Sequence, residues 1–419
     1  MPTCRETVFF QADMKILHTS DWHLGQHFMG KTRQAEHLAF IDWLIGQVDA
    51  QQVDAVIVAG DLFDTGAPPS YARELYNHFV VELSATGAQL VLLGGNHDSV
   101  ATLSESRTLL ARLNAHVIPC AGGLPEAQVL LLPQRNGEAG ALLCAVPFIR
   151  PRDVLQSQAG QSAEDKQLSL QDAIRRHYHA LHAQACRLRE ARGDALPIIA
   201  TGHLTTVGAS ASESVREIYV GSLDAFPTSA FPPADYIALG HIHRPQKVGG
   251  LEHIRYSGSP IPLGFDEAGQ GKEVLLVELD SSGLRVVTPL PVPRFQALLS
   301  VAGSLAELGD AIRDAATHGD AERPVWLEVR VREDDYLSDL QTRIDALTDG
   351  LPVEVLRIRR DRDRAAVALT GEASETLDEL TPDDVFARRL QGETLSDELK
   401  TRLERRYREI VAGLQEDAA

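Results

Sequence analysis

The sequence has few cysteines and aromatic residues, and it contains no long apolar run. Its four cysteines, Cys4, Cys120, Cys144 and Cys186, form no CxxC pair. This spacing favours neither a thiolate zinc site nor a disulfide framework, and it suits a reducing cytoplasm. No apolar segment approaches the roughly 18 residues of a membrane span, and the N-terminus lacks the apolar core of a signal peptide. We therefore expect a soluble, cytoplasmic protein that does not enter a membrane.

The chain also lacks an excess of positive charge. Its 40 Lys and Arg residues against 59 Asp and Glu residues give a formal net charge of −19 at pH 7. This balance argues against a protein that holds a polyanion by bulk charge, as a basic-patch DNA-binding protein does. Nucleic acid is not excluded as a substrate, because bound divalent cations would create a local cationic site.

The organisation of the 419 residues predicts an α/β protein with more than one structural unit. Apolar runs rich in Val, Ile and Leu alternate with segments of helical period up to about residue 245, as in βα units around a largely parallel sheet. We expect a disordered tail or a misassigned start at 1–13, a main domain at 14–290, a small α+β capping unit at 295–370 and a helical pair at 375–419.

Five apolar runs end in polar residues, usually directly after a glycine. These residues are Asp21 and His23, then Asp61, then the run Asn96, His97 and Asp98, then His203, and finally His241 and His243. Because the carboxyl ends of neighbouring parallel strands lie along one edge of a sheet, these groups can converge although they are far apart in sequence. Glycine lets the backbone turn sharply and come close to a bound group.

Together these side chains predict a dinuclear metal site. The set is too large for structural zinc and contains no thiolate. It can hold two divalent ions about 3.5 to 4 Å apart with one bridging carboxylate. Mn²⁺ suits such ligands best, although Fe, Co or Zn are tolerated. A local charge of about +2 would suit a phosphodiester and its transition state. Each motif alone has a simpler explanation, such as a helix cap or a core histidine, but those explanations do not account for all five strand ends.

The motifs DxH, GDLFD, GNHD, GH and GHIH, in this order, resemble the calcineurin-like metallophosphoesterases. That family packs two sheets face to face between helices, so the resemblance implies a β-sandwich flanked by helices. With HTSDWHLG, GHIHRPQ and YSGSPIPLGFDE, the chain after Met14 is more specifically similar to the Mre-type repair nucleases. The resemblance implies a nucleoid-associated, manganese-dependent hydrolase acting in DNA repair, recombination and replication. It would be a 3′ to 5′ double-strand exonuclease and a single-strand or hairpin endonuclease, using activated water and no covalent intermediate.

The same resemblance implies a role for each site residue. One metal would be bound by Asp21, His23, Asp61 and His243, and the other by Asp61, Asn96, His203 and His241, with Asp61 bridging. His97 would contact the scissile phosphate or the leaving oxygen, and Asp98 would fix the ring and tautomer of His97. Relatives often have histidine where this chain has Asp64. We expect Asp64 to orient a metal ligand or to cap the following helix.

A stripe of apolar residues near the C-terminus suggests a partner surface. The stripe has spacings of three and four and comprises Leu395, Leu399, Leu403, Tyr407, Ile410 and Leu414. It could pack on the protein's own core, but the resemblance favours a partner. Such relatives use a C-terminal helical pair to bind the coiled-coil base of an ABC-type ATPase, in a heterotetramer with two copies of each chain. A homodimer contact through helices near 33–50 and 69–85 is also implied.

Two other functions stay open on the sequence alone. A phosphoprotein phosphatase or a small-molecule phosphodiesterase would use the same metals. Ser/Thr phosphatases usually carry Arg and Glu where this chain has Thr65 and Asp98, and the long segment after Leu290 is unusual for a compact phosphodiesterase. A non-catalytic binding module would have lost ligands, yet all the expected ones are present. We interpret three further histidines, on a helix predicted to be exposed, as surface residues: His177, His179 and His182.

Overall fold

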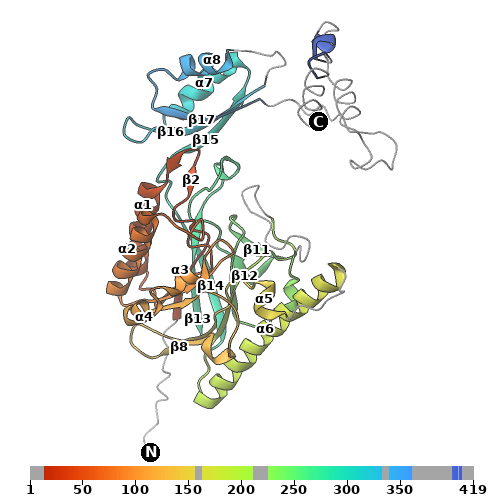
Figure 1. Cartoon of the computed structure of the whole chain (residues 1–419). Coiled ribbons are helices and arrows are strands. Elements are labelled where there is room, and N and C mark those ends of the chain that lie inside the picture. Colours follow the sequence, from red (N-terminus) through yellow and green to blue (C-terminus); the bar gives the residue numbers. More distant parts are fainter. Residues whose placement is uncertain are drawn as a thin grey trace, which may run out of the picture. The chain divides into compact units, whose positions relative to one another are not determined.

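Two six-stranded sheets form the main body of the protein (Figure 1). The computed structural model describes residues 14–155, 163–210, 225–332, 339–360, 399–403 and 405–407. The chain divides into one compact unit of Met1–Val331 with Leu337–Arg359 and a second of Arg332–Tyr336 with Arg360–Ala419. The tail expected at 1–13 and most of the helical pair expected at 375–419 lie outside the described residues.

The first sheet has the strand order β14-β13-β1-β4-β5-β6. Its strands are β1 (Met14–Thr19), β4 (Ala55–Val58), β5 (Gln89–Leu93), β6 (Ala115–Ile118), β13 (Glu273–Asp280) and β14 (Gly283–Pro291). Strands β1, β4, β5 and β6 run parallel, as expected from alternating apolar runs and helices. Strands β13 and β14 are antiparallel additions. Helices α1 (Gln34–Ala50) and α2 (Ser70–Thr86) pack on the outer face of this sheet.

The second sheet has the strand order β11-β12-β10-β9-β8-β7. Its strands are β7 (Val129–Pro133), β8 (Ala139–Cys144), β9 (Ile198–His203), β10 (Tyr236–Gly240), β11 (Gln246–Val248) and β12 (Leu251–Tyr256). Strands β8, β9, β10 and β12 run parallel. Strands β7 and β8 form the hairpin expected at Asn136-Gly137, where Gly137 has a φ of +86°.

Helix α6 (Ala163–Arg192) covers the outer face of the second sheet, and the expectation of an exposed helix is wrong for one of its sides. Ile174 and Tyr178 on this helix are buried. His177 Nε2 lies 3.1 Å from Gln128 Oε1, and His179 Nε2 lies 3.2 Å from the Ala230 carbonyl oxygen. Among the described residues, no potential metal-binding group includes these histidines.

The core between the two sheets confirms the expected sandwich. The apolar side chains that meet there come from both sheets and include Ile16, Ile57, Val91, Leu143, Ile199, Ala238 and Val277. Since both faces of the inner strands are buried, these strands read as continuous apolar runs rather than as alternating patterns.

Short elements connect the larger ones. They are the hairpin β2 (His27–Phe28) and β3 (Lys31–Thr32), the helices α3 (Val100–Ser104), α4 (Arg107–Leu110) and α5 (Pro151–Val154), and the 3₁₀ turns Ala111–Leu113, Pro125–Ala127, Thr228–Ala230 and Phe265–Glu267. No helix in the described ranges is long and apolar enough to cross a membrane.

The segment after β14 has the order β, α, β, α, β that the sequence predicted. It comprises β15 (Leu298–Gly303), α7 (Leu305–Ala316), β16 (Val325–Val331), α8 (Leu340–Thr348) and β17 (Val353–Arg360). Ser304 and Glu307 form a capping box at the start of α7. Helices α7 and α8 bury one sheet face through Leu308, Ile312 and Ile344. Trp326 packs with Phe28 and Phe265 of the main body, so the small sheet borders the β2–β3 hairpin.

A histidine joins the two large sheets through the core. His18 on β1 is fully buried; its Nδ1 lies 2.9 Å from Tyr236 Oη on β10, and its Nε2 lies 3.2 Å from the Leu239 carbonyl oxygen. Because a carbonyl can only accept, Nε2 donates to Leu239 and Nδ1 accepts from the Tyr236 hydroxyl. Both nitrogens of the neutral ring are thereby satisfied. Burial lowers the pKa of His18 to about 3.

Acid should destabilise the sandwich through His18. The unfolded chain takes up a proton at this histidine below pH 6.5, whereas the folded protein does so only near pH 3. Stability is therefore lost as the pH falls through 6.5, by about 2 kcal/mol between pH 7 and pH 5. We expect the double variant His18→Leu/Tyr236→Phe to lose this part of the pH dependence. Urea unfolding at both pH values measures it, and an unchanged difference from wild type would contradict the assignment.

Candidate metal centre

The loops that follow β1 and β4 are hydrogen-bonded to each other along their backbones. Asp21 N donates to Gly60 O at 3.0 Å, His23 N donates to Asp61 O at 3.1 Å, and Leu24 N donates to Leu62 O at 2.9 Å. These bonds bring the first two polar strand ends side by side at one edge of the first sheet. The convergence expected from parallel strands is thus produced by loop pairing as well as by the sheet.

The backbone at several expected ligands adopts an unusual conformation. Seven non-glycine residues of the described chain have positive φ, and four of them are expected ligands: Asp21 (56°), His23 (48°), Asp61 (50°) and His241 (96°). Positive φ is uncommon outside glycine, although Asn, Asp and His tolerate it best. Such backbone strain concentrates at functional sites, where the surrounding structure holds it in place.

Gly95 in the run LGGNHDS permits a close approach rather than a turn. We expected Gly94 and Gly95 to turn the chain, but neither has positive φ. A Cβ atom added at Gly95 would instead overlap the Asp61 side chain, and one at Gly94 would overlap the Pro119 carbonyl. The absence of a side chain at Gly95 therefore leaves room for the Asp61 carboxylate.

Asp61 lies at the centre of the cluster. Its Oδ2 is 3.2 Å from His203 Nε2 and 3.7 Å from His23 Nε2, while its Oδ1 accepts the His97 backbone N–H at 2.9 Å. Three groups of side chains have ligand atoms close enough to share a metal ion: Asp21, His23 and His243; His23, Asp61 and His97; Asp61, His203 and His241. The structure thus brings all the expected imidazole and carboxylate ligands together.

Three ligand atoms meet at His203 with a cation's geometry. Its Nδ1 lies 2.9 Å from the Ala59 carbonyl oxygen and must donate to it. In the neutral ring, Nε2 then carries only a lone pair, yet it lies 2.8 Å from Asn96 Oδ1 and 3.2 Å from Asp61 Oδ2. A proton or a metal ion has to separate these atoms. Without metal, burial opposes the charged ring, but the Asp61 carboxylate prevails and raises the pKa of His203 to about 9.

The electrostatics of the other groups follow from the same crowding. Burial opposes ionisation of Asp61, but His203 and His23 hold its pKa well below the usual range. Burial, together with His203, lowers the pKa of His241 to about 3, so this ring stays neutral and able to bind a cation. The ring nitrogen His23 Nε2 is buried without a hydrogen-bond partner. An unsatisfied buried nitrogen beside a carboxylate is expected of a metal ligand in the absence of its ion.

Carboxylates outside the cluster orient two of the imidazoles. His23 Nδ1 lies 3.1 Å from Asp64 Oδ1, and His243 Nδ1 lies 3.0 Å from Glu267 Oε1. Metal-binding histidines usually donate their second ring nitrogen in this way, which fixes the tautomer. The expectation that Asp64 orients a ligand is confirmed by its contact with His23.

The role expected for Asp98 is wrong. Its side chain does not hold His97; it accepts backbone N–H groups of Leu62 (3.1 Å), Phe63 (2.9 Å) and Gly95 (2.9 Å). His97 Nδ1 instead lies 2.7 Å from the carbonyl oxygen of Asp64. Asp98 therefore fixes the loop after β4 against the loop after β5. Burial and the nearby Asp61 raise the pKa of Asp98 to about 6.

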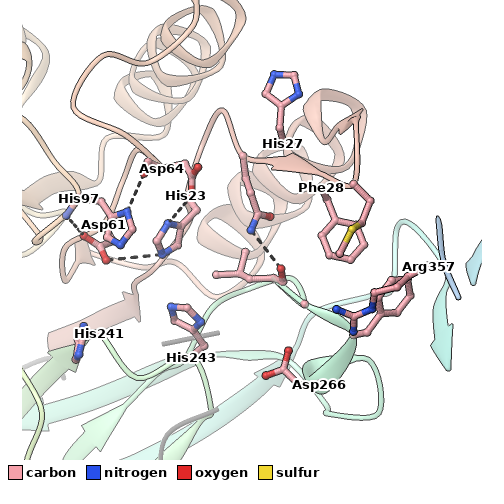
Figure 2. Close-up of a pocket in the computed structure, with 15 residues that line it drawn as sticks. His23, His27, Phe28, Asp61, Asp64, His97, His241, His243, Asp266 and Arg357 are labelled. Atoms are coloured by element: carbon pink, nitrogen blue, oxygen red, sulfur yellow. Dashed lines mark hydrogen bonds and ion pairs between the residues drawn. The ribbon is translucent and has the colours of Figure 1, made fainter. Parts of the chain in front are cut away.

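A cavity of about 500 Å³ opens in front of the cluster (Figure 2). Among its lining residues are His23, Asp61, His97, His241 and His243 on the metal side, with His27, Phe28 and Asp266 farther along the wall. Arg357 of β17 reaches the same wall, where its guanidinium lies 5.1 Å from the Phe265 ring centre. The small sheet therefore contributes a cationic side chain to the cavity.

Several residues of the site were not found from the sequence. Glu267, Lys272 and Arg357 were not singled out, and Asp64 was recognised only through its place in GDLFD. The motif YSGSPIPLGFDE carried a signal, because it was specific to the resemblance but had no assigned chemistry. Arg357 carried none, since it is one of many arginines in a charged segment.

Comparisons with known proteins identify the class. Residues 14–245 match the family model described as calcineurin-like phosphoesterase, which spans more than half of the chain. The protein therefore belongs to the calcineurin-like phosphoesterase family, as its motifs predicted. Membership implies that it binds divalent metal ions and hydrolyses phosphate esters.

Within this class, the most specific matches are to proteins named as the SbcD component of the nuclease SbcCD. The one from Escherichia coli (strain K12) is 54% identical over 395 residues, covering 93% of this chain and 96% of that protein. Those from Rhodobacter capsulatus and Bacillus subtilis (strain 168) are 34% and 31% identical, covering 89% and 83% of this chain and 94% and 83% of those proteins. A further family model, described as Type 5 capsule protein repressor C-terminal domain, matches residues 294–394. The chain thus belongs to the SbcD branch of the family.

Proposed function

We propose that this protein is the nuclease component of an SbcCD-type complex. It would act as a metal-dependent 3′ to 5′ exonuclease on double-stranded DNA and as an endonuclease on single strands and hairpins, in the processing of DNA ends during repair, recombination and replication. One observation carries the proposal most strongly: the expected ligands and His97 surround one cavity in a chain 54% identical to a protein named as part of a nuclease.

The donor set fits two divalent ions, for which we propose Mn²⁺. The site with Asp21, His23 and His243 and the site with Asn96, His203 and His241 would share Asp61. Asp61 Oδ2 lies 3.7 Å from His23 and 3.2 Å from His203, which belong to different sites, and this supports a bridging role. Mixed carboxylate, amide and imidazole ligands suit Mn²⁺.

The mechanism we propose divides the work between ions and side chains. When bound, the ions supply Lewis-acid polarisation of the phosphate and lower the pKa of an attacking water. The chain's residues position the substrate and the proton. The Asp64 carbonyl accepts from His97 Nδ1, so His97 meets the substrate through Nε2. There the ring can stabilise the charged phosphate or give a proton to the leaving oxygen.

Digestion of DNA tests this function directly. Linear double-stranded DNA and hairpins would be incubated with the protein in Mn²⁺, with and without SbcC and ATP. We expect cleavage that requires the metal and stops with EDTA. Efficient hydrolysis of a phosphopeptide without any DNA cleavage would overturn the proposal and favour a phosphoprotein phosphatase.

Arg357 is expected to contact the DNA backbone. Arg357 and Arg330 both bind Glu328, at 2.5 Å and 2.9 Å, so two guanidinium groups share one carboxylate and a positive charge remains. Because Arg357 lines the cavity, we expect Arg357→Gln to raise the KM for DNA about tenfold and to weaken its salt dependence, with little change in kcat. Arg343→Gln on α8 is the matched control. An effect confined to kcat would contradict a binding role.

An SbcC ATPase is the proposed partner, in a heterotetramer with two copies of each chain. Of the apolar stripe near the C-terminus, the described residues Leu399 and Leu403 are 41% and 38% exposed. An apolar helical face of this kind suits binding in the groove of a partner. With a net charge of −19, the protein would depend on SbcC to hold long DNA. A homodimer through α1 and α2 and an association with the nucleoid are part of the same proposal.

Deletion of residues 375–419 is expected to abolish co-purification with SbcC while leaving two bound Mn²⁺ ions per chain. The reason is that none of the expected ligands lies in this segment. Pull-down and metal analysis on the same preparation measure both quantities. A deleted protein that still co-purifies with SbcC would disprove the role of the stripe.

A further inference from the structure

A buried series of polar contacts runs from His243 through Glu267 to Lys272, and the proposed mechanism does not use its far end. Glu267 Oε1 lies 3.0 Å from His243 Nδ1, and Glu267 Oε2 lies 2.6 Å from Lys272 Nζ. The side chains of Glu267 and Lys272 are 0% and 2% exposed. Burying two charges is costly even when they pair, so such a pair is weak evidence for stability alone. Its contact with an expected metal ligand suggests a different role.

The same residues also hold the backbone of His243. Lys272 Nζ donates to the His243 carbonyl oxygen at 3.0 Å and lies 2.8 Å from Ser259 Oγ. Ser259 N donates to the same carbonyl at 3.1 Å, and Leu263 N donates to Glu267 Oε2 at 3.0 Å. The ring and the main chain of His243 are therefore fixed by one network, which leaves the imidazole little freedom to rotate.

This network also determines which ring nitrogen is available. An ionised carboxylate only accepts hydrogen bonds, so His243 Nδ1 carries the proton and Nε2 carries the lone pair. His243 belongs with Asp21 and His23 in one potential metal-binding group. The same stretch of chain reaches a second member of this group, because Ser257 Oγ lies 2.9 Å from Ser20 Oγ, which donates to Asp21 Oδ2 at 2.6 Å.

We propose that Glu267 and Lys272 are positioning residues for the metal site of Asp21, His23 and His243, and that they set the Mn²⁺ affinity of this site without affecting the other. The inference rests on the proposed function and assigns a role to the YSGSPIPLGFDE segment. Glu267 orients His243, and Lys272 anchors Glu267 to the His243 main chain. Partners of this kind typically change metal affinity by about 10- to 100-fold.

Metal titration of the full-length protein tests the inference apart from nuclease activity. Free Mn²⁺ would be measured by electron paramagnetic resonance in wild type and in the double variant Glu267→Gln/Lys272→Met. This variant removes both buried charges together and nearly preserves side-chain volume. We expect wild type to bind two ions, and the variant to bind one with unchanged affinity and the other about 10- to 100-fold more weakly. The unfolding temperature in EDTA checks the fold.

Two controls assign the effect to one site. Arg33→Met/Glu36→Gln removes another buried ion pair, whose side chains are 1% and 3% exposed, and should leave both sites as in wild type. Asn96→Ala should weaken the other site, and its combination with the double variant should weaken both. Should the double variant fail to fold, Glu267→Asp, which keeps both charges but shortens the carboxylate arm, is expected to weaken the same site.

The outcomes separate the inference from the proposed function. A folded Glu267→Gln/Lys272→Met protein that binds two Mn²⁺ ions as tightly as wild type would overturn the inference and leave the nuclease proposal standing. Equal weakening of both sites would also overturn it. A wild-type protein that binds no Mn²⁺ would overturn both the inference and the nuclease proposal.

Discussion

An Asp61→Asn variant is expected to cleave DNA at least ~10³-fold more slowly than wild type at saturating Mn²⁺. Asp61 Oδ2 lies within 3.7 Å of imidazoles from both expected sites, and Oδ1 accepts the His97 backbone N–H. An amide would carry no negative charge between two cations, and its NH₂ group would point a donor where acceptors are needed. Cleavage rates and bound Mn²⁺ per chain measure the effect.

The control for Asp61→Asn is a carboxylate at the other end of the same strand. Asp54, just before β4, is buried and accepts the backbone N–H groups of Lys15 (2.7 Å) and Arg135 (2.8 Å). Asp54→Asn should lower stability but leave the cleavage rate of the folded protein within about twofold, since this effect on stability is separate from the site. If Asp61→Asn retained a tenth of the wild-type rate, the bridging role would be disproved.

A His97→Ala variant is expected to keep both metal ions but to lose about 10²- to 10⁴-fold in the rate of cleavage. The imidazole is held by the Asp64 carbonyl through Nδ1, whereas the contact with Asp61 is made by the His97 backbone nitrogen, which alanine retains. The variant should therefore separate chemistry from metal binding. Single-turnover cleavage and Mn²⁺ titration measure the two effects.

The matched control for His97 is His116 on β6, a partly buried histidine that is not among the cavity-lining residues. His116→Ala should change neither metal binding nor cleavage. Loss of an Mn²⁺ ion in His97→Ala would show that His97 is a metal ligand, which its place in one potential metal-binding group with His23 and Asp61 also permits. That result would contradict the proposed role of His97.

The sequence predicted the elements and the cluster because both depend on local patterns. Apolar runs gave β1, β4, β5, β9 and β10 in nearly the observed positions, and the polar residues that end them lie together in the structure. The orientation of these residues was not predictable in the same way. Asp98 was expected to hold His97 because they are neighbours in the chain, but its acceptors were used by a loop 35 residues earlier.

Contacts between remote segments account for the other errors. Glu267 reaches His243 across 24 positions, a separation that no short motif encodes. Helix α6 was expected to be exposed because its composition is polar, yet one side of it covers a whole sheet. His18 gave no signal, since the hydrogen bonds that make it a core residue come from β10, more than 200 positions later. Local chemistry thus identified the ligands, and the tertiary fold decided how each is held.

The pairing of β1 with β13 has a consequence for the synthesis of this protein. Strand β1 lies in the interior of its sheet, but one neighbour, β13, ends only at Asp280. At about 5 to 20 residues per second, a ribosome spends many seconds between making β1 and making its partner. During that time β1 presents an unpaired edge, which is an aggregation hazard in a nascent chain. A stalled product that ended before β13 would therefore contain every expected metal ligand and still be unable to close the sheet that supports them.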